Sequence, residues 1–380
     1  MAGKEFKLIR EPDALYEVTY ILDAALGPGE GREPHSSGIE FAAGHYERRF
    51  GLSRAVCEKW FTPLREIERH VTDGLALSEE VLRRDYRAPN EALSPPSALV
   101  RHAMRYDLSV EKLAALIYNE AASIAPGDEG NRDELSLEEF VRLMSGLDEH
   151  EAPLYHRWNM LDLCVNWEQR FAEISSVLRR GEELYMEKVS LAEPLIGEWY
   201  GRTKEALDDG GLDALFDGPL DLTLPDGLYI VRPGLECFAS TSIILDSLLT
   251  DPGGKGPWEL ISGVLTQSLA RTGAFSMLRF QDSLKAVADK KRLDILAALR
   301  EGPRSAGELA SITGLSAATV THHMQILFNA GLVGLELRGA RSIYSLNRGG
   351  VELLESDLRE FFGRGRRSGR RCRSPCAGGR

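Results

Sequence analysis

The chain has 380 residues, of which 43% are hydrophobic and 27% charged, a composition typical of a globular protein with a sizeable core. At this length we expect two domains. Its apolar runs, such as Leu228–Val231, are far too short to cross a bilayer, so we expect no membrane-spanning segment.

Charge is distributed unevenly along the chain. Residues 1–281 carry a net charge of −19, residues 282–362 are neutral, and residues 363–380 contain seven arginines and no acidic residue. Such asymmetry indicates segments with separate functions. We expect residues 363–380 to be a disordered basic tail, because they contain too few apolar residues to fold.

The cysteines and the N-terminus indicate the compartment. The five cysteines, an odd number, argue against a disulfide framework. Residues 1–13 lack the apolar stretch of a secretion signal. We therefore expect a cytoplasmic protein, and we expect it to hold no cofactor or metal.

Residues 1–275 are predicted to form a mostly helical N-terminal domain for sensing or oligomerisation. Apolar residues recur at helical spacing in 13–26, 53–71, 109–122 and 154–180. Ser136 and Glu139 have the spacing of a capping box, which predicts the start of a further helix.

The pattern changes near residue 219. Leucines alternate with polar residues up to a turn at Pro225–Gly227, and short strands are predicted at 228–231 and 235–239. We predict a small β-meander over about 219–240, followed by helices at 242–249 and 258–271. The predicted fold class is mostly α (α+β), with a winged helix-turn-helix at the C-terminal end.

Residues 276–362 carry that winged helix-turn-helix pattern. Ser305 and Glu308 form a second capping-box pattern, which opens a short helix, and Gly314 stands where a glycine ends one. Ser316 begins a second helix that runs to about Asn329. Residues 335–346 then read as a hairpin with a basic turn at 338–341, and this combination is typical of proteins that bind duplex DNA.

The second helix predicts which residues contact DNA. Val320, Met324 and Leu327 recur at helical spacing and are expected to face the core. On the other side, Thr321 can donate or accept a hydrogen bond, and Gln325 can pair with adenine. His322 can donate to a purine N7 or to phosphate, and the hairpin arginines can contact phosphate or the minor groove. The predicted DNA contacts are Ser316, Ala317, Ala318, Thr319, Thr321, His322, Gln325, Arg338 and Arg341.

Three segments within this region resemble the ArsR family of winged-helix repressors. They are residues 284–296 (LKAVADKKRLDIL), residues 315–323 (LSAATVTHH) and residues 330–333 (AGLV). The resemblance covers about 80 residues, in matching order and spacing. It implies a cytoplasmic homodimer that binds a palindromic duplex operator as a repressor and releases it when a signal arrives.

The chain also departs from this family. The family's thiolate sensing motif would fall at residues 308–313, which contain no cysteine, and the last helix, 351–362, contains no histidine for the family's other metal site. Ala317 stands where family members often carry a base-reading glutamine. The last helix resembles the family's dimer-forming helix, but its apolar face could equally pack within the chain.

Three functions are considered, of which we expect the first, so we expect the protein not to be an enzyme. The first is a regulator whose N-terminal domain responds to a small-molecule or protein effector and controls operator affinity. The second is an N-terminal enzyme localised by a DNA-binding module, although no catalytic motif is present. The third is a metal sensor that uses Cys57, Cys164, Cys237 or the N-terminal histidines.

Overall fold

The computed structural model describes most of the chain. The described residues are 4–26, 47, 53–88, 93–106, 108–122, 132, 134–147, 152–211, 215, 222–223, 226–237, 241–244, 257–266, 275–315, 317–338 and 341–363. The predicted tail lies outside them, apart from Gly363. None of the described helices is long and apolar enough to cross a membrane.

Helices form most of the first 211 residues, as predicted. Asp13 opens the first one by accepting a hydrogen bond from the Tyr16 N–H, and the Ser136–Glu139 capping box is confirmed at another. The helices are α1 (Ala14–Ala24), α3 (Arg54–Leu75), α4 (Glu79–Val81), η2 (Leu82–Tyr86), α5 (Pro96–Tyr106), α6 (Val110–Ala122), α7 (Leu137–Gly146), α8 (Leu154–Val165), α9 (Trp167–Lys188), η3 (Val189–Ala192) and α10 (Glu193–Gly210).

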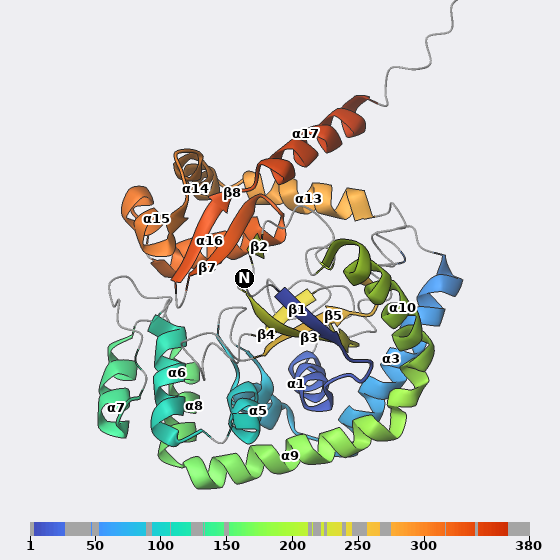
Figure 1. The fold of residues 1–380 in the computed structure, drawn as a ribbon. Coiled ribbons are helices and arrows are strands. Elements are labelled where there is room, and N and C mark those ends of the chain that lie inside the picture. The colour runs from blue at the N-terminus through green and yellow to red at the C-terminus, as the bar shows by residue number, and fades with distance from the viewer. Residues whose placement is uncertain are drawn as a thin grey trace, which may run out of the picture.

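The long helical pattern predicted over 154–180 is two helices rather than one. The chain leaves the helical conformation at Asn166, where φ is −105° and ψ is 35°, and α9 begins at the next residue. Asparagine favours such helix ends because its short polar side chain competes with the helical backbone hydrogen bonds. α8 and α9 therefore run in different directions (Figure 1).

A four-stranded sheet lies beside these helices. Its order is β1-β3-β5-β4, with β1 parallel to β3, β3 parallel to β5, and β4 antiparallel to β5. The strands are β1 (Lys4–Leu8), β3 (Gly227–Gly234), β4 (Thr241–Ile244) and β5 (Trp258–Gly263).

The predicted meander is wrong. The strand at 228–231 exists within β3, but β3 pairs with β1 and β5 rather than with the preceding strand, β2 (Leu222–Thr223). Residues 235–237 form a turn instead of a strand, and β4 and β5 stand where two helices were predicted to begin. The reason is that a short apolar run buried in a sheet cannot be told from a buried helix by periodicity alone.

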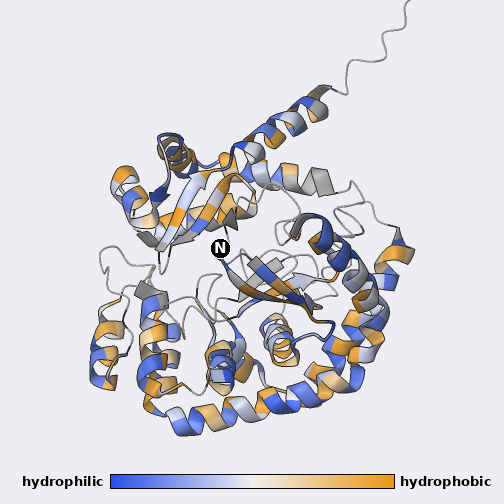
Figure 2. Ribbon diagram, in the orientation of Figure 1, coloured by the Kyte–Doolittle hydropathy of each residue, from blue (hydrophilic) through white to orange (hydrophobic). Residues whose placement is uncertain are grey.

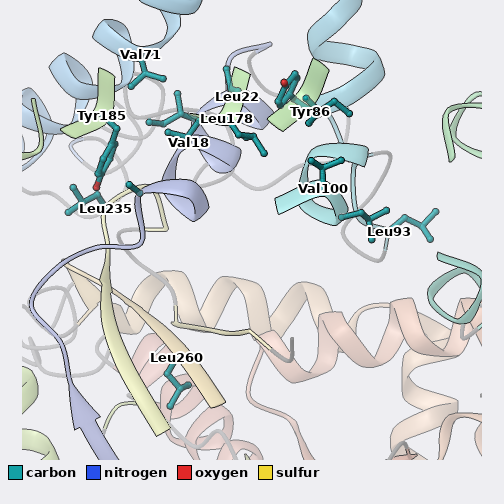
Figure 3. Packing of buried hydrophobic residues seen from close by; sticks show 14 of the residues in the cluster. Val18, Leu22, Val71, Tyr86, Leu93, Val100, Leu178, Tyr185, Leu235 and Leu260 are labelled. Carbon is teal, nitrogen blue, oxygen red and sulfur yellow. The ribbon is translucent and has the colours of Figure 1, made fainter. Parts of the chain in front are cut away.

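A large hydrophobic cluster, called here the N-terminal cluster, joins the helices to the sheet. It contains Val18 of α1, Tyr185 of α9 and Leu260 of β5, among many others (Figure 3). A Cβ on Gly181 would lie 2.5 Å from Val18 Cγ1, so a glycine at this position lets α9 pack closely on α1. Figure 1 shows α9 along the rim, with α1 between it and the strands.

The C-terminal part forms a second hydrophobic cluster, called here the C-terminal cluster, around buried residues such as Ile295, Leu309 and Met324. Figure 2 shows hydrophilic and hydrophobic residues mixed along the last helix, α17 (Arg348–Gly363), as in an amphipathic helix. The elements are α13 (Phe275–Val287), α14 (Lys290–Arg300), β6 (Arg304–Ser305), α15 (Ala306–Thr313), α16 (Ala317–Asn329), β7 (Val333–Arg338), β8 (Arg341–Leu346) and α17 (Arg348–Gly363).

Candidate nucleic-acid interface

The predicted helix-turn-helix is confirmed as α15 and α16. Ser305 Oγ accepts a hydrogen bond from the Glu308 N–H at 3.3 Å, and the Glu308 carboxylate accepts one from the Ser305 N–H at 2.7 Å. The bond from the Ser305 N–H, and one from the Ser305 hydroxyl to the same carboxylate at 3.0 Å, lower the pKa of Glu308. Gly314 has a φ of 65° and ends α15 in the left-handed conformation, which glycine adopts without steric cost. α16 begins three residues later, at Ala317.

One face of α16 packs against the rest of the C-terminal part. Val320, Met324 and Leu327 are fully buried in the C-terminal cluster, as their spacing predicted. Because α16 is held by this face, the positions on the opposite side point away from the cluster. The helix is therefore fixed in rotation by three apolar residues.

The predicted DNA contacts on α16 fall on the remaining positions. Thr319 and Thr321 are half-buried. The backbone of Ala317, Ala318, His322 and Gln325 is part of the helix, but their side chains, and the whole of Ser316, lie outside the described part of the chain. The structure thus confirms the helical backbone of the predicted contacts from Ala317 onward, while all contacts with DNA stay a prediction.

The wing is confirmed as the antiparallel pair of β7 and β8. Arg338 and Arg341 are partners in the register at the end of this hairpin, so both arginines stand at its tip. Their side chains, and residues 339–340 between them, are outside the described residues. β6 pairs with the other side of β8 and joins the wing to the start of α15.

A basic residue in segment 284–296, Arg292, has a structural role. Arg292 donates from Nε to the Ala286 carbonyl at 2.6 Å and from Nη2 to the Lys285 carbonyl at 2.9 Å. Its own N–H donates to Asp289, which caps α14. Arg292 therefore stabilises the corner between α13 and α14.

The structure adds one element that the sequence did not predict here. β2 lies parallel to β7, with Leu222 opposite Leu335 and Thr223 opposite Glu336. The sheet that contains the wing therefore has the order β2-β7-β8-β6 and begins with a strand from the N-terminal part of the chain. The only local signal was the alternation before the turn at Pro225, and it did not reveal the partner.

Side chains reinforce this connection. Leu335 of β7 and Phe328 of α16 are half-buried and pack against the N-terminal cluster, and Phe328 also packs against the C-terminal cluster. We call the β2–β7 pairing and these two side chains the wing junction. It joins the N-terminal part to both the second helix and the wing (Figure 1).

The cysteines of the N-terminal part offer poor metal ligands. Cys57, Cys164 and Cys237 are buried, and burial raises the pKa of all three thiols, that of Cys164 to about 12. Metal binding requires thiolates, which these environments disfavour. Burial also lowers the pKa of His156 to about 4. Among the described residues, no three His, Cys, Asp or Glu side chains are grouped so as to hold a metal ion.

A helix-turn-helix followed by a hairpin wing defines a DNA-binding regulator. The family model described as bacterial regulatory protein, arsR family, matches residues 289–334, from the cap of α14 into β7. The HTH-type transcriptional regulator YgaV of Escherichia coli is 36% identical over 80 residues, which cover 21% of this chain and 81% of that protein.

Two proteins of Bacillus subtilis are also similar. The arsenical resistance operon repressor is 33% identical over 70 residues, or 18% of this chain and 67% of that protein. The transcriptional repressor SdpR is 35% identical over 63 residues, or 17% of this chain and 70% of that protein. The chain belongs to the ArsR family of bacterial transcriptional regulators, and most of its length lies outside these matches.

Proposed function

We propose that this protein is a cytoplasmic repressor that binds duplex operator DNA through α16 and the wing. The N-terminal half of α16 would enter the major groove, because its core-facing residues leave the opposite side for base edges. Thr321, His322 and Gln325 would read bases, with Ser316, Ala317, Ala318 and Thr319 beside them, and Arg338 and Arg341 would contact phosphate or the minor groove.

The protein is further proposed to act as a homodimer. α13 and α17 contact each other through the rings of Phe280 and Phe361, whose centroids are 5.3 Å apart. Phe362 next to them is 73% exposed. An exposed aromatic residue beside a packed pair favours burial against a second copy. A dimer would place two α16 helices about 34 Å apart on a palindromic site.

We also propose that residues 1–275 form a domain that controls the operator affinity of a DNA-binding domain at 276–362. The single observation that supports this control is the wing junction, in which a strand of the N-terminal part extends the wing sheet. An effector, either a small molecule or a protein, that moves β2 would also move β7. Small changes in the spacing of two reading helices are enough to lose operator affinity.

This control can be tested without knowing the effector. All five tryptophans precede residue 281, so their fluorescence reports unfolding of the N-terminal part alone. If the two parts are coupled, binding of DNA must shift the stability of the N-terminal part, because linkage is reciprocal. We expect a duplex selected from a random-sequence pool to shift the tryptophan-detected midpoint of unfolding.

Proline in β2 should abolish this shift. In a parallel pair only every second residue hydrogen-bonds to a given neighbouring strand. One of the two variants Leu222→Pro and Thr223→Pro therefore removes an N–H that donates to β7, and both are made so that this one is included. The control is Thr223→Ala, which keeps the N–H. Equal shifts in the parent and in both proline variants, or no shift in the parent, would contradict control through the wing junction.

A further inference from the structure

Two carboxyl groups are buried together at the carboxyl end of β3. Glu17 of α1 is 0% exposed, and Glu236, in the turn after β3, is 5% exposed. Glu17 accepts a hydrogen bond from the Leu235 N–H at 3.0 Å through one oxygen and one from the Glu236 N–H at 2.8 Å through the other. The Glu17 side chain thus holds the turn in which the second carboxyl group lies.

Polar atoms around this pair are incompletely satisfied. Glu236 Oε1 and the hydroxyl of Tyr185 are buried and make no hydrogen bond. Tyr185 comes from α9, and Figure 3 shows its hydroxyl directed toward Leu235, whose N–H binds Glu17. Buried polar atoms without partners are rare in proteins and call for an explanation.

The surrounding charges are mostly negative. On α1, Asp13 lies close enough to repel Glu17, but it is ion-paired with Arg105 of α5. Arg105 also binds Glu259 of β5 at 2.7 Å. Among the described residues, the remaining titratable groups that act on the pair are Tyr185 of α9, Cys237 after β3 and Glu68 of α3.

Burial dominates the electrostatics of the pair. The two backbone N–H groups favour ionised Glu17, but desolvation outweighs them and raises the pKa of Glu17 to about 8. Burial raises the pKa of Glu236 as well, and the nearby carboxylates of Glu68 and Glu17 raise it further. The two groups therefore resist being ionised at the same time. Because both carboxyl groups are buried, the pair is poorly suited to act on a substrate.

We propose that Glu17 and Glu236 form a proton-binding site that stabilises the turn after β3. Loss of the proton destabilises this turn and weakens the pairing of β2 with β7 at the wing junction. A proton binds directly to a carboxylate oxygen, so a buried pair of carboxyl groups can hold one without a cavity around it. β3 begins at Gly227, four residues after Thr223 ends β2, so the strand connects the pair to the wing junction within a single short segment. The second half of this inference rests on the proposed control of DNA binding.

The first test is the pH dependence of stability. A carboxyl group whose pKa is raised by folding stabilises the folded state most at low pH, and this contribution falls as the pH rises from about 4.5 through about 8. Tryptophan fluorescence in urea reports the unfolding equilibrium constant of the N-terminal part. Between about pH 6 and about pH 8, we expect this constant to rise roughly 10- to 100-fold more in the parent than in Glu17→Gln.

Two further variants complete this test. Glu236→Gln removes the second titrating group without removing the carboxylate that the backbone N–H groups bind, so it keeps the test decisive if Glu17→Gln fails to fold. Glu183→Gln, at an exposed position of α9 with a side chain that is 65% exposed, is the matched control and should behave like the parent. A parent whose pH dependence equals that of Glu236→Gln would overturn the proton site.

The second test concerns the wing junction. The shift that the selected duplex causes in the tryptophan-detected midpoint should differ between about pH 6 and about pH 8 in the parent and in Glu183→Gln, and it should differ less in Glu236→Gln, which keeps Glu17 as its one titrating group of the pair. A DNA-induced shift that is the same at both pH values overturns the link from the pair to the wing. No DNA-induced shift at either pH contradicts the proposed control itself, so the two failures are distinguishable.

Discussion

Replacing Thr321 or His322 by alanine is expected to weaken operator binding by roughly 5- to 150-fold each, or ~1–3 kcal/mol. Both positions lie on α16 outside its buried face of Val320, Met324 and Leu327. The lost contacts should be specific to one base pair each. Titration of labelled duplexes with single-base changes should therefore show that each variant discriminates less at one position and normally elsewhere.

Arginine variants at the wing tip should behave differently. Arg338→Ala and Arg341→Ala should weaken binding to all sequences and lower the slope of log affinity against log salt by about one, because each removes a phosphate contact. Arg180→Ala, at an exposed position of α9, is the control for loss of a positive charge. If all four variants bind the operator like the parent, α16 and the wing are not the DNA-binding surface.

Gly350→Ala is expected to destabilise the C-terminal part by about 3 kcal/mol, the upper range for overpacking. A Cβ at this position would lie 1.8 Å from the carbonyl oxygen of Gly331, and backbone atoms cannot move aside easily. The same corner is held by Asn347, whose N–H donates to the Leu332 carbonyl at 3.0 Å and whose Oδ1 accepts from the Gly350 N–H at 3.2 Å. The substitution should therefore loosen α17 from the segment between α16 and β7.

Amide hydrogen exchange of peptides from α16, β7 and α17 measures this effect, since this region has no tryptophan. Gly349→Ala is the matched control, because Gly349 is exposed in the same helical turn. Alanine there should protect α17 slightly, through its better helix propensity of about 1 kcal/mol. Equal protection in both variants would show that the close approach at Gly350 does not hold α17.

Local patterns in the sequence predicted the DNA-binding part well. The capping box at Ser305 and Glu308, the left-handed Gly314 and the buried face of α16 each depend on residues within one or two helical turns. Their hydrogen bonds and burial are therefore determined by residues that lie close together in the sequence. The family match at residues 289–334 covers the same segments.

The N-terminal sheet could not be predicted in this way. β3 bonds to β1, whose register pairs Lys4 with Gly227, and to β5. A strand's partners depend on which distant segments share its apolar face, and a pattern of a few residues does not specify them. The same limit explains why Trp258–Gly263 was predicted as a helix and why β2 was placed beside β3 instead of β7.

By itself, the amino-acid sequence determined that this protein carries a winged helix-turn-helix with an acidic, mostly helical N-terminal part. Only the tertiary structure decided that β2 extends the wing sheet and that Glu17 meets the turn at Glu236. The physical reason is separation along the chain. Periodicity and capping act over a few residues, whereas strand pairing and the burial of charge depend on contacts that exist only once the whole chain has folded.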